Sequence, residues 1–219
     1  MAKVLITREF EQPLADLLVA NGHGVVHVPL VELVATGNEK PSVAPDAVLV
    51  TSQAVARFVP ELAGCIGQAR TAVVGQATAS ALRRVGVHAQ YVGSAGGLDA
   101  LAGLEIEQGE CVWFIGAMDP SPKLAERLGR LGVHQWSVYE NRVPIDAAKR
   151  LKQAEYDVVT FTSGSAVTAF VDGGGDVSTL AVVLGTTTQA AARRCGFDRV
   201  TCAETHTLTA LATSVPATV

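Results

Sequence analysis

Residues 46–58 read D-A-V-L-V-T-S-Q-A-V-A-R-F, and residues 157–170 read D-V-V-T-F-T-S-G-S-A-V-T-A-F. Each stretch runs from an aspartate through an apolar segment into Thr-Ser, and then into small residues that end at a phenylalanine. Residues 74–86 match residues 184–196 in the same way at an offset of about 110, with Gly75 falling on Gly185 and Thr78 on Thr188. Two units of this length are too long for a solenoid repeat and have the size of small domains.

Apolar segments of strand length alternate with helical segments along the chain. The expected strands are residues 4–7, 25–28, 47–50, 71–74, 88–92, 112–115, 134–138, 158–161, 180–184 and 199–202. They are continuous apolar runs, which is typical of strands that are covered on both faces. Ten such strands, five in each repeat, predict two doubly wound α/β domains with parallel sheets and right-handed crossovers.

The repeat can be divided into domains in two ways. One cut near Gln108 and Gly109 gives two halves of five strands each. In the other, the first β-α-β segment joins the C-terminal part, and residues from about 31 to 137 form the second domain. The second division requires the chain to cross between domains near Pro29 and Tyr139, which are equivalent positions of the repeat. The pattern of residues alone favours neither division.

Composition excludes several classes of protein. The 219 residues are 48% hydrophobic and 17% charged, so the chain can bury a large core, and its net charge of −4 gives no indication of nucleic-acid binding. The apolar runs are too short to span a membrane, and the N-terminus reads as a strand and not as a signal peptide. The four cysteines lack metal or redox spacing, which predicts a reducing cytoplasm. The five histidines are isolated, and we interpret them as structural.

Polar residues follow the carboxyl ends of several expected strands, where ligands bind in open α/β sheets. A single Ser or Thr at such a position is most simply a helix cap. Free N–H groups and the helix dipole also make these positions anion sites, and their recurrence in two domains favours a ligand with many carboxylates or phosphates. The candidate binding residues are Thr7, Arg8, Thr51, Ser52, Gly75, Thr78, Thr162, Ser163, Gly164, Ser165, Gly185, Thr186, Thr187 and Thr188.

The sequence lacks the motifs of common cofactor sites. No G-x-G-x-x-G follows the first strand, and neither a Walker loop nor a G-x-S-x-G elbow occurs. Ser163 and Ser165 have no convincing histidine and acid partners, and no expected strand ends in an Asp/Glu cluster for a metal ion. We therefore expect no metal and no nucleotide cofactor, and a chemistry that relies on few ionisable groups.

An ordered set of motifs resembles the uroporphyrinogen-III synthase family over the chain from Val4 to about Leu211. The motifs are L-I-T-R, D-A-V-L-V-T-S, V-V-G-Q-A-T-A, W-S-V-Y, D-V-V-T-F-T-S-G-S-A-V and L-G-T-T-T-Q-A-A. The resemblance implies two flavodoxin-like domains joined by a two-stranded linker, with residues 1–30 and 140–219 in one domain and residues 31–139 in the other.

The resemblance also implies an activity. The family's enzymes are cofactor-free, cytoplasmic lyases of heme biosynthesis, and we expect this one to be a monomer. They dehydrate and cyclise hydroxymethylbilane to uroporphyrinogen III and invert the terminal ring through a spiro intermediate. The acetate and propionate groups on every ring of that substrate match the polyanion expected from the strand ends. A binding protein or sensor core that closes on an anionic small molecule without catalysis is the alternative.

Two positions of the resemblance bear on mechanism. Tyr139 matches the family tyrosine that is placed to donate a proton to the departing hydroxyl, and its alternative role is packing in the linker. After Gly116 many members carry an arginine, whereas this chain has Lys123 further on, which lacks the bidentate fork of arginine. This departure from the family pattern leaves open whether the substrate contact after Gly116 is altered.

Overall fold

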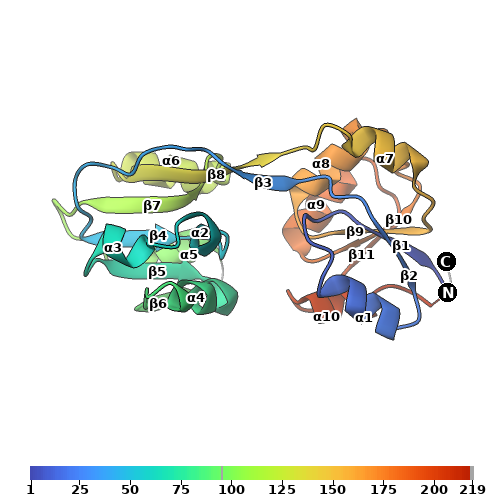
Figure 1. The fold of residues 1–219 in the computed structure, drawn as a ribbon, viewed down its shortest axis with the longest axis horizontal. Helices are drawn as coiled ribbons and strands as arrows, with labels where there is room; N and C mark the ends of the chain where they lie inside the picture. The colour runs from blue at the N-terminus through green and yellow to red at the C-terminus, as the bar shows by residue number, and fades with distance from the viewer. Residues whose placement is uncertain (95, 218–219) are drawn as a thin grey trace. The chain divides into compact units, whose positions relative to one another are not determined.

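The computed structural model describes residues 1–94 and 96–217. The chain forms two compact units, each built on one sheet with helices on both faces (Figure 1). Unit 1 comprises Met1–Leu33 and Arg142–Val219, and unit 2 comprises Val34–Asn141. The division of the sequence into one domain of residues 1–30 with 140–219 and another of residues 31–139 stays a prediction.

The sheet of unit 1 has five parallel strands in the order β11-β10-β9-β1-β2. These strands are β1 (Lys3–Ile6), β2 (Gly24–His27), β9 (Val158–Phe161), β10 (Leu180–Val183) and β11 (Val200–Cys202). The helices are α1 (Leu14–Ala20), α7 (Ala147–Gln153), α8 (Gly164–Asp172), α9 (Thr186–Arg194) and α10 (Leu208–Thr213). Helices α7, α8 and α9 pack on one face, and α1 and α10 pack on the other, so that the strands are buried on both sides.

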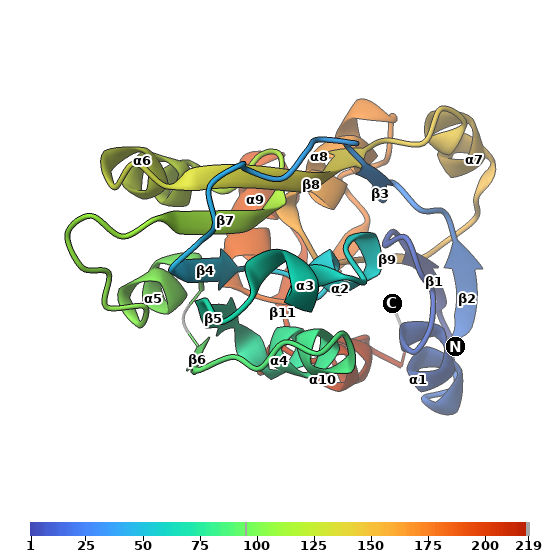
Figure 2. The same cartoon turned by 60° about the vertical axis from the view of Figure 1, so that its left-hand side comes forward.

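The sheet of unit 2 has the order β3-β8-β7-β4-β5-β6. Its strands are β3 (Glu32–Ala35), β4 (Ala47–Val50), β5 (Arg70–Val74), β6 (Tyr91–Gly93), β7 (Val112–Ala117) and β8 (His134–Arg142). The helices are α2 (Val55–Phe58), α3 (Leu62–Ile66), α4 (Gly75–Arg84), α5 (Gly97–Ala102) and α6 (Pro122–Arg130). Leucines and alanines of α5 and α6 pack with Leu49 and Phe114 on one face. Helices α2 and α3 lie on the other face (Figures 1 and 2).

The two sheets repeat one strand order. Counted from β9, the sheet of unit 1 reads 3-2-1-4-5, and the parallel strands of unit 2 read the same when they are counted from β4. Strand β1 pairs with β9, Val4 facing Val158, so the first β-α-β segment of the chain completes the sheet of the second repeat. Strands β7 and β8 of the second repeat in turn complete the sheet of the first repeat.

The α/β fold with two parallel sheets is confirmed, and most strands lie where the sequence predicts them. The exception is β3, which pairs with β8, and the Thr36 N–H next to it donates to the Val138 carbonyl at 3.3 Å. The chain passes from unit 1 to unit 2 within β3 and returns at the end of β8, as the two-stranded linker requires. The strand expected at residues 88–92 is shorter and begins at Tyr91.

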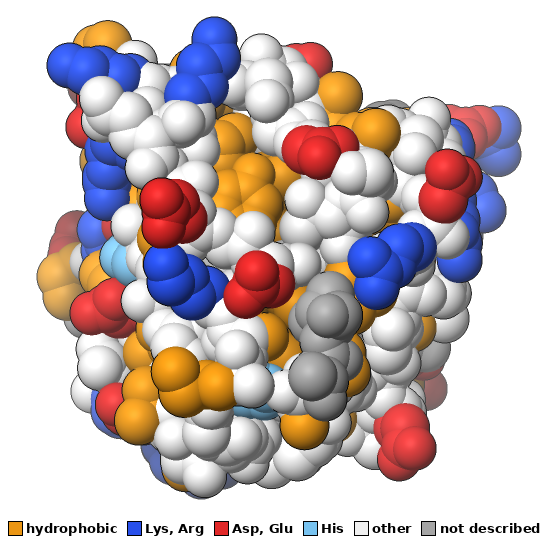
Figure 3. Space-filling model, turned by 90° about the vertical axis from the view of Figure 1, so that its right-hand side faces the viewer, with side chains coloured by type: hydrophobic (Ala, Val, Ile, Leu, Met, Phe, Trp, Pro, Cys, Tyr) orange, Lys and Arg blue, Asp and Glu red, His pale blue; other side chains and the backbone are white. Residues whose placement is uncertain are grey.

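The surface is mixed in charge. On the face drawn in Figure 3, basic and acidic side chains of the described residues are interspersed with polar and apolar ones. Among the described residues, no helix combines the length and the apolar character needed to cross a membrane.

Candidate functional site

Three of the predicted segments lie side by side at the carboxyl edge of the unit 1 sheet. Strands β10, β9 and β1 are parallel neighbours, so the residues that follow them leave the sheet at the same edge. Residues 185–188 follow β10, residues 162–165 follow β9, and Arg8 follows β1. This edge therefore brings together the start of two helices and a guanidinium group, as expected for an anion site in an open sheet.

Helix α9 begins without a side-chain cap. Gly185 precedes it in an extended conformation with φ −168°, and the described residues show no side-chain cap hydrogen bond at its start. Thr186 and Thr187 are exposed, whereas Thr188 is 5% exposed and packs inward. The first N–H groups of the helix and its dipole can therefore meet a carboxylate, with two threonine hydroxyls beside it.

Helix α8 begins differently. The Ser163 hydroxyl accepts a hydrogen bond from the Ala166 N–H at 3.3 Å and lies 3.0 Å from the Ser165 hydroxyl. A Cβ at Gly164 would stand 3.2 Å from the Cβ of Ala191, so this glycine lets the start of α8 lie close to α9. The predicted segment 162–165 thus contributes a capped helix, and Ser163 is committed to capping.

Arg8 is the cation of this edge. It is partly buried, and its guanidinium makes no ion pair with a carboxylate of the described residues. Burial lowers the pKa of Arg8 from its ordinary value, although an arginine stays charged at neutral pH. A desolvated guanidinium without a carboxylate partner is poised to receive an anion.

Thr7, the residue before Arg8, is buried between two strands. It is 1% exposed, and its hydroxyl donates to the Thr160 carbonyl at 2.7 Å. Thr160 returns the contact by donating to the Leu5 carbonyl at 2.9 Å. The Thr7 hydroxyl therefore joins β1 to β9, and the expectation that Thr7 binds a ligand stays a prediction.

The carboxyl edge of unit 2 carries the equivalent segments after β5 and β4. Gly75 opens α4 with φ +75°, a conformation that favours glycine, and a Cβ at this position would meet no heavy atom within 4 Å. Thr78 is 4% exposed and packs inward, as its equivalent Thr188 does. Thr51 and Ser52, both partly buried, follow β4.

Tyr139 meets Ser52 at this edge. It lies in β8, which is separated from β4 by β7 alone, and its phenol shares a side-chain hydrogen bond with Ser52. Its ring stacks on Phe58, with centroids 5.5 Å apart, and the residue is 6% exposed. Burial raises the pKa of the Tyr139 phenol, and the hydrogen bond from Ser52 opposes that rise in part. The structure thus joins two residues that the sequence placed on separate strands.

His206 is a neighbour of the site that the sequence did not reveal. A Cβ added to Gly185 would lie 2.4 Å from Cε1 of the His206 ring, so the imidazole covers this glycine. The exposed histidine comes from the segment after β11, and no motif or spacing connects it with residue 185. Gly185 therefore makes room for an imidazole at the position where we expected close approach of a ligand to the backbone.

Two further expectations concern charge and metal. Lys123 lies exposed in the first turn of α6, after β7, and Ser121 before that helix makes no side-chain cap. Within the described part of the chain, no three His, Cys, Asp or Glu side chains are grouped so that they could hold a metal ion.

Solved structures with this arrangement define the class of fold. Uroporphyrinogen-III synthetase from Helicobacter pylori matches with a TM-score of 0.70 and 17% identity, covering 97% of each chain. A mutant uroporphyrinogen III synthase from Thermus thermophilus matches with a TM-score of 0.67 and 18% identity, covering 97% of this chain and 96% of that one. The chain thus has the two-unit α/β fold of these enzymes.

The sequence makes the assignment specific. The family model described as uroporphyrinogen-III synthase HemD matches residues 12–213. The chain therefore belongs to the uroporphyrinogen-III synthase family, whose members are lyases that act on a tetrapyrrole in heme biosynthesis. The resemblance stated from the motifs is confirmed, and nothing favours the alternative of a binding protein. No curated protein compared with the chain matches it.

Proposed function

We propose that the chain converts hydroxymethylbilane to uroporphyrinogen III, with the two carboxyl edges binding the substrate's carboxylates and Tyr139 donating the proton. The observation that carries the proposal is the carboxyl edge of unit 1, where the uncapped start of α9 and Arg8, which has no carboxylate partner among the described residues, follow the two strands that flank β9. Such an edge suits a ligand rich in carboxylates.

Binding at the unit 1 edge uses two kinds of donor. The N–H groups at the start of α9, with the hydroxyls of Thr186 and Thr187, would hold one carboxylate. Arg8 would hold a second one, because a guanidinium presents two parallel N–H groups to a carboxylate. Gly75 and the N–H groups at the start of α4 offer the equivalent surface in unit 2.

The chemical step begins with loss of the hydroxyl of hydroxymethylbilane. As the carbon–oxygen bond breaks, the Tyr139 phenol gives its proton to the departing hydroxyl, which leaves as water. Because burial raises the pKa of this phenol, it carries its proton at neutral pH, and Ser52 can donate to the phenolate that forms. Ring closure releases a proton from a pyrrole carbon, and that proton restores the phenol. Positioned acid catalysis of this kind contributes about a hundredfold or more.

Steering of the substrate is the second contribution. Hydroxymethylbilane closes without assistance to the I isomer, so an enzyme must direct the terminal ring to react through its substituted carbon. Fixing several carboxylates holds the chain in a curled conformation with that ring turned, and orientation of reacting groups lowers the barrier strongly. We further propose that one chain acts as a monomer in the cytoplasm, since it supplies every group that this scheme requires.

The decisive experiment measures which isomer the purified protein makes. The protein is mixed with fresh hydroxymethylbilane, without added metal or nucleotide, and the oxidised porphyrins are separated by chromatography. The III isomer should predominate, whereas heat-denatured protein should give the I isomer. If the native protein also gives the I isomer alone at the uncatalysed rate, the proposal fails and the non-catalytic alternative replaces it.

A further inference from the structure

Both repeats carry a phenylalanine in the helix that follows β4 or β9, but the two rings have different surroundings. The helices share the pattern A-V-x-x-F, which ends at Phe58 in unit 2 and at Phe170 in unit 1. Phe170 is 0% exposed and packs in the core against Phe161 and Phe197, with ring centroids 5.4 and 5.7 Å away. Phe58 is only partly buried, and its ring stacks on Tyr139 with an angle of 21° between the planes. The ring of unit 1 thus fills the core, whereas that of unit 2 covers the proposed proton donor.

The sequence explains why Phe58 lies outside the core. A proline disfavours the helical conformation at the residue before it, and Val59, before Pro60, has φ −133° and ψ 73°. Helix α2 therefore ends at Phe58 after four residues, whereas α8 has no proline at the equivalent point and continues to Asp172. Phe58 thus stands at the end of a short helix, where its ring contacts Tyr139.

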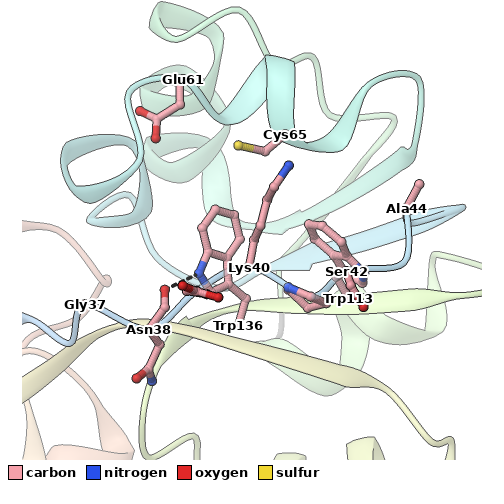
Figure 4. Close-up of a pocket in the computed structure, with 11 residues that line it drawn as sticks. Gly37, Asn38, Lys40, Ser42, Ala44, Glu61, Cys65, Trp113 and Trp136 are labelled. Atoms are coloured by element: carbon pink, nitrogen blue, oxygen red, sulfur yellow. Dashed lines mark hydrogen bonds between the residues drawn. The ribbon is translucent and has the colours of Figure 1, made fainter.

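The backbone of Tyr139 is held by the sheet. The register of β7 and β8 shifts just before Ala117, which pairs with Tyr139, and an irregularity of this kind changes the direction of a side chain. The Met118 N–H donates to the Tyr139 carbonyl at 2.8 Å. Nearer the start of β8, the Trp136 indole N–H donates to the Asn38 carbonyl at 3.0 Å (Figure 4). These bonds fix where the Tyr139 side chain leaves the strand, but not how its ring is turned.

The segment that includes α2 contacts the phenol at its oxygen and on its ring. Ser52 shares a hydrogen bond with the Tyr139 hydroxyl, and the Ser52 oxygen also accepts the Ala54 N–H at 3.2 Å, which holds this serine before the helix. Phe58, at the other end of the helix, covers the ring. The Arg57 guanidinium lies 5.1 Å from the centroid of the Phe58 ring, a cation–π contact that helps to hold that ring. One short segment therefore sets the orientation of the phenol through two contacts.

We propose that Phe58 is a positioning residue for the proton transfer: its ring holds the Tyr139 phenol at Ser52 and shields it from water, so that the departing hydroxyl of the substrate receives the proton. The inference rests on the proposed function, which assigns the proton to Tyr139. Phe58 contacts no reacting atom and acts through the phenol. Because a small displacement of a catalytic group can cost about a hundredfold in rate, loss of one of the two contacts should cost about tenfold.

The first test compares substitutions by the steady-state kinetics of III-isomer formation. Phe58→Leu keeps an apolar side chain but removes the flat ring, so kcat should fall about tenfold while the KM for hydroxymethylbilane stays nearly unchanged. Phe58→Tyr keeps the flat ring and should restore most of the wild-type kcat. Phe170→Leu, which changes the equivalent ring of unit 1, is the matched control. It should lower the thermal stability, because it leaves a cavity in the core, and it should leave both kinetic constants unchanged.

A double-mutant cycle shows whether Phe58 acts through the phenol. In Tyr139→Phe the proton donor is absent, so that adding Phe58→Leu should cause no further loss of kcat. Two substitutions that act independently would instead multiply their effects.

A second test needs no substrate. Burial raises the pKa of the Tyr139 phenol, and the Phe58 ring is part of what buries it. NMR titration of the full chain with ¹³C-labelled tyrosines should therefore show a lower pKa for Tyr139 in Phe58→Leu than in the wild type, because water then reaches the phenol. Tyr139→Phe assigns the signal. The signal of Tyr156, in unit 1, should titrate alike in both proteins.

Four results would each overturn the proposal: a wild-type kcat in Phe58→Leu, a Phe58→Tyr variant as slow as Phe58→Leu, independent losses in the double-mutant cycle, or an unchanged Tyr139 pKa. If Phe58→Leu does not fold, Phe58→Met takes its place under the same criteria. Failure of the proposed function looks different, because the wild type itself then makes no III isomer, and the role of Phe58 falls with it.

Discussion

The carboxyl edges of the two sheets are built from equivalent strands in the same order, yet they carry different groups. In unit 1 the segments after β9 and β10 open into helices of nine residues, and Arg8 follows the next strand. In unit 2 the segment after β4 leads to a helix of four residues, and Ser52 pairs with the Tyr139 phenol. The repeat therefore preserves the strand order, while the side chains that follow the strands differ between the two units.

Replacing the phenol of unit 2 should have the largest effect. Tyr139→Phe keeps the ring that stacks on Phe58 and removes the proton donor. Formation of the III isomer should slow about a hundredfold, with product binding little changed, because acid catalysis contributes at least that much. Initial rates at saturating hydroxymethylbilane measure the effect. Tyr156→Phe, in unit 1, is the matched control, and an equal loss there or full activity in Tyr139→Phe would remove the assigned role.

Replacing Arg8, the cation at the carboxyl edge of unit 1, should affect substrate binding more than the catalytic step. Arg8→Gln should weaken binding of uroporphyrinogen III about tenfold or more, the cost of one hydrogen bond to a charged group. Thermal stability should not fall, because the guanidinium is desolvated in the fold without a carboxylate partner among the described residues. Calorimetric titration and thermal unfolding measure the two effects. Arg194→Gln, at the far end of α9, controls for general charge, and equal affinities in both variants would contradict the prediction.

The two helix starts of unit 1 allow a crossed comparison. Thr187→Ala should weaken product binding by about 1 kcal/mol and leave stability unchanged, because Thr187 is exposed beside an uncapped helix start. Ser163→Ala should lower the free energy of unfolding by about 1 kcal/mol, because it removes a helix cap. Urea unfolding and binding titrations of both variants give the four values. The opposite pattern would show that α8, and not α9, receives the anion.

The smallest effect concerns the ion pair between Arg70 and Glu110 in unit 2. The equivalent strand of unit 1 has no arginine at that position. Arg70, at the start of β5, makes two hydrogen bonds of 2.6 and 2.8 Å with Glu110, whereas its equivalent at the start of β10 is Leu180. The Arg70 guanidinium, with the Glu107 N–H, lowers the pKa of Glu110 to about 2. Since this pKa lies below that of an unfolded glutamate, about 4.3, the pair stabilises the fold above that pH.

The stabilisation by Glu110 should disappear as the pH falls from about 4 to about 2, because the carboxylate is protonated there in the folded state as well. Glu110→Gln should therefore unfold at a slightly lower temperature than the wild type at pH 7 and at the same temperature near pH 2. The difference should be small, since surface ion pairs contribute little. Thermal scans at several pH values test this, with Glu126→Gln of the Arg130 pair as control. A difference independent of pH would rule out the ion pair as its cause.

The repeat and the apolar runs made most of the fold predictable. Buried strands such as Ala47–Val50 and Val158–Phe161 consist of continuous apolar residues, so they can be recognised in the sequence. Strand β3 cannot be recognised in this way, because Glu32–Ala35 is only partly buried and forms through its pairing with β8. The pattern of residues alone also did not predict that β1 pairs with β9. A repeat indicates where strands form, but it does not indicate which sheet each strand joins.

The candidate site was predictable in its position but not in its contacts. Topology alone places the residues after parallel strands at one edge, which is why residues 162–165 and 185–188 lie together. The direction of each side chain depends on packing, and packing turns the Thr7 hydroxyl toward a backbone carbonyl and buries Thr78 and Thr188. His206 lies over Gly185 through the path of a loop, which no local pattern in the sequence encodes.

The pairing of β1 with β9 has a consequence for the growing chain. Lys3 donates its N–H to the Asp157 side chain, 154 residues later, so the first strand has no permanent neighbour on that side until most of the protein has been synthesised. Unit 2 is continuous and can assemble in the interval, because domains generally fold as units during synthesis. The apolar β1-α1-β2 segment meanwhile exposes an unpaired strand edge, a state that promotes aggregation. The N-terminal segment is therefore the part of the nascent chain that waits longest for its partner strand.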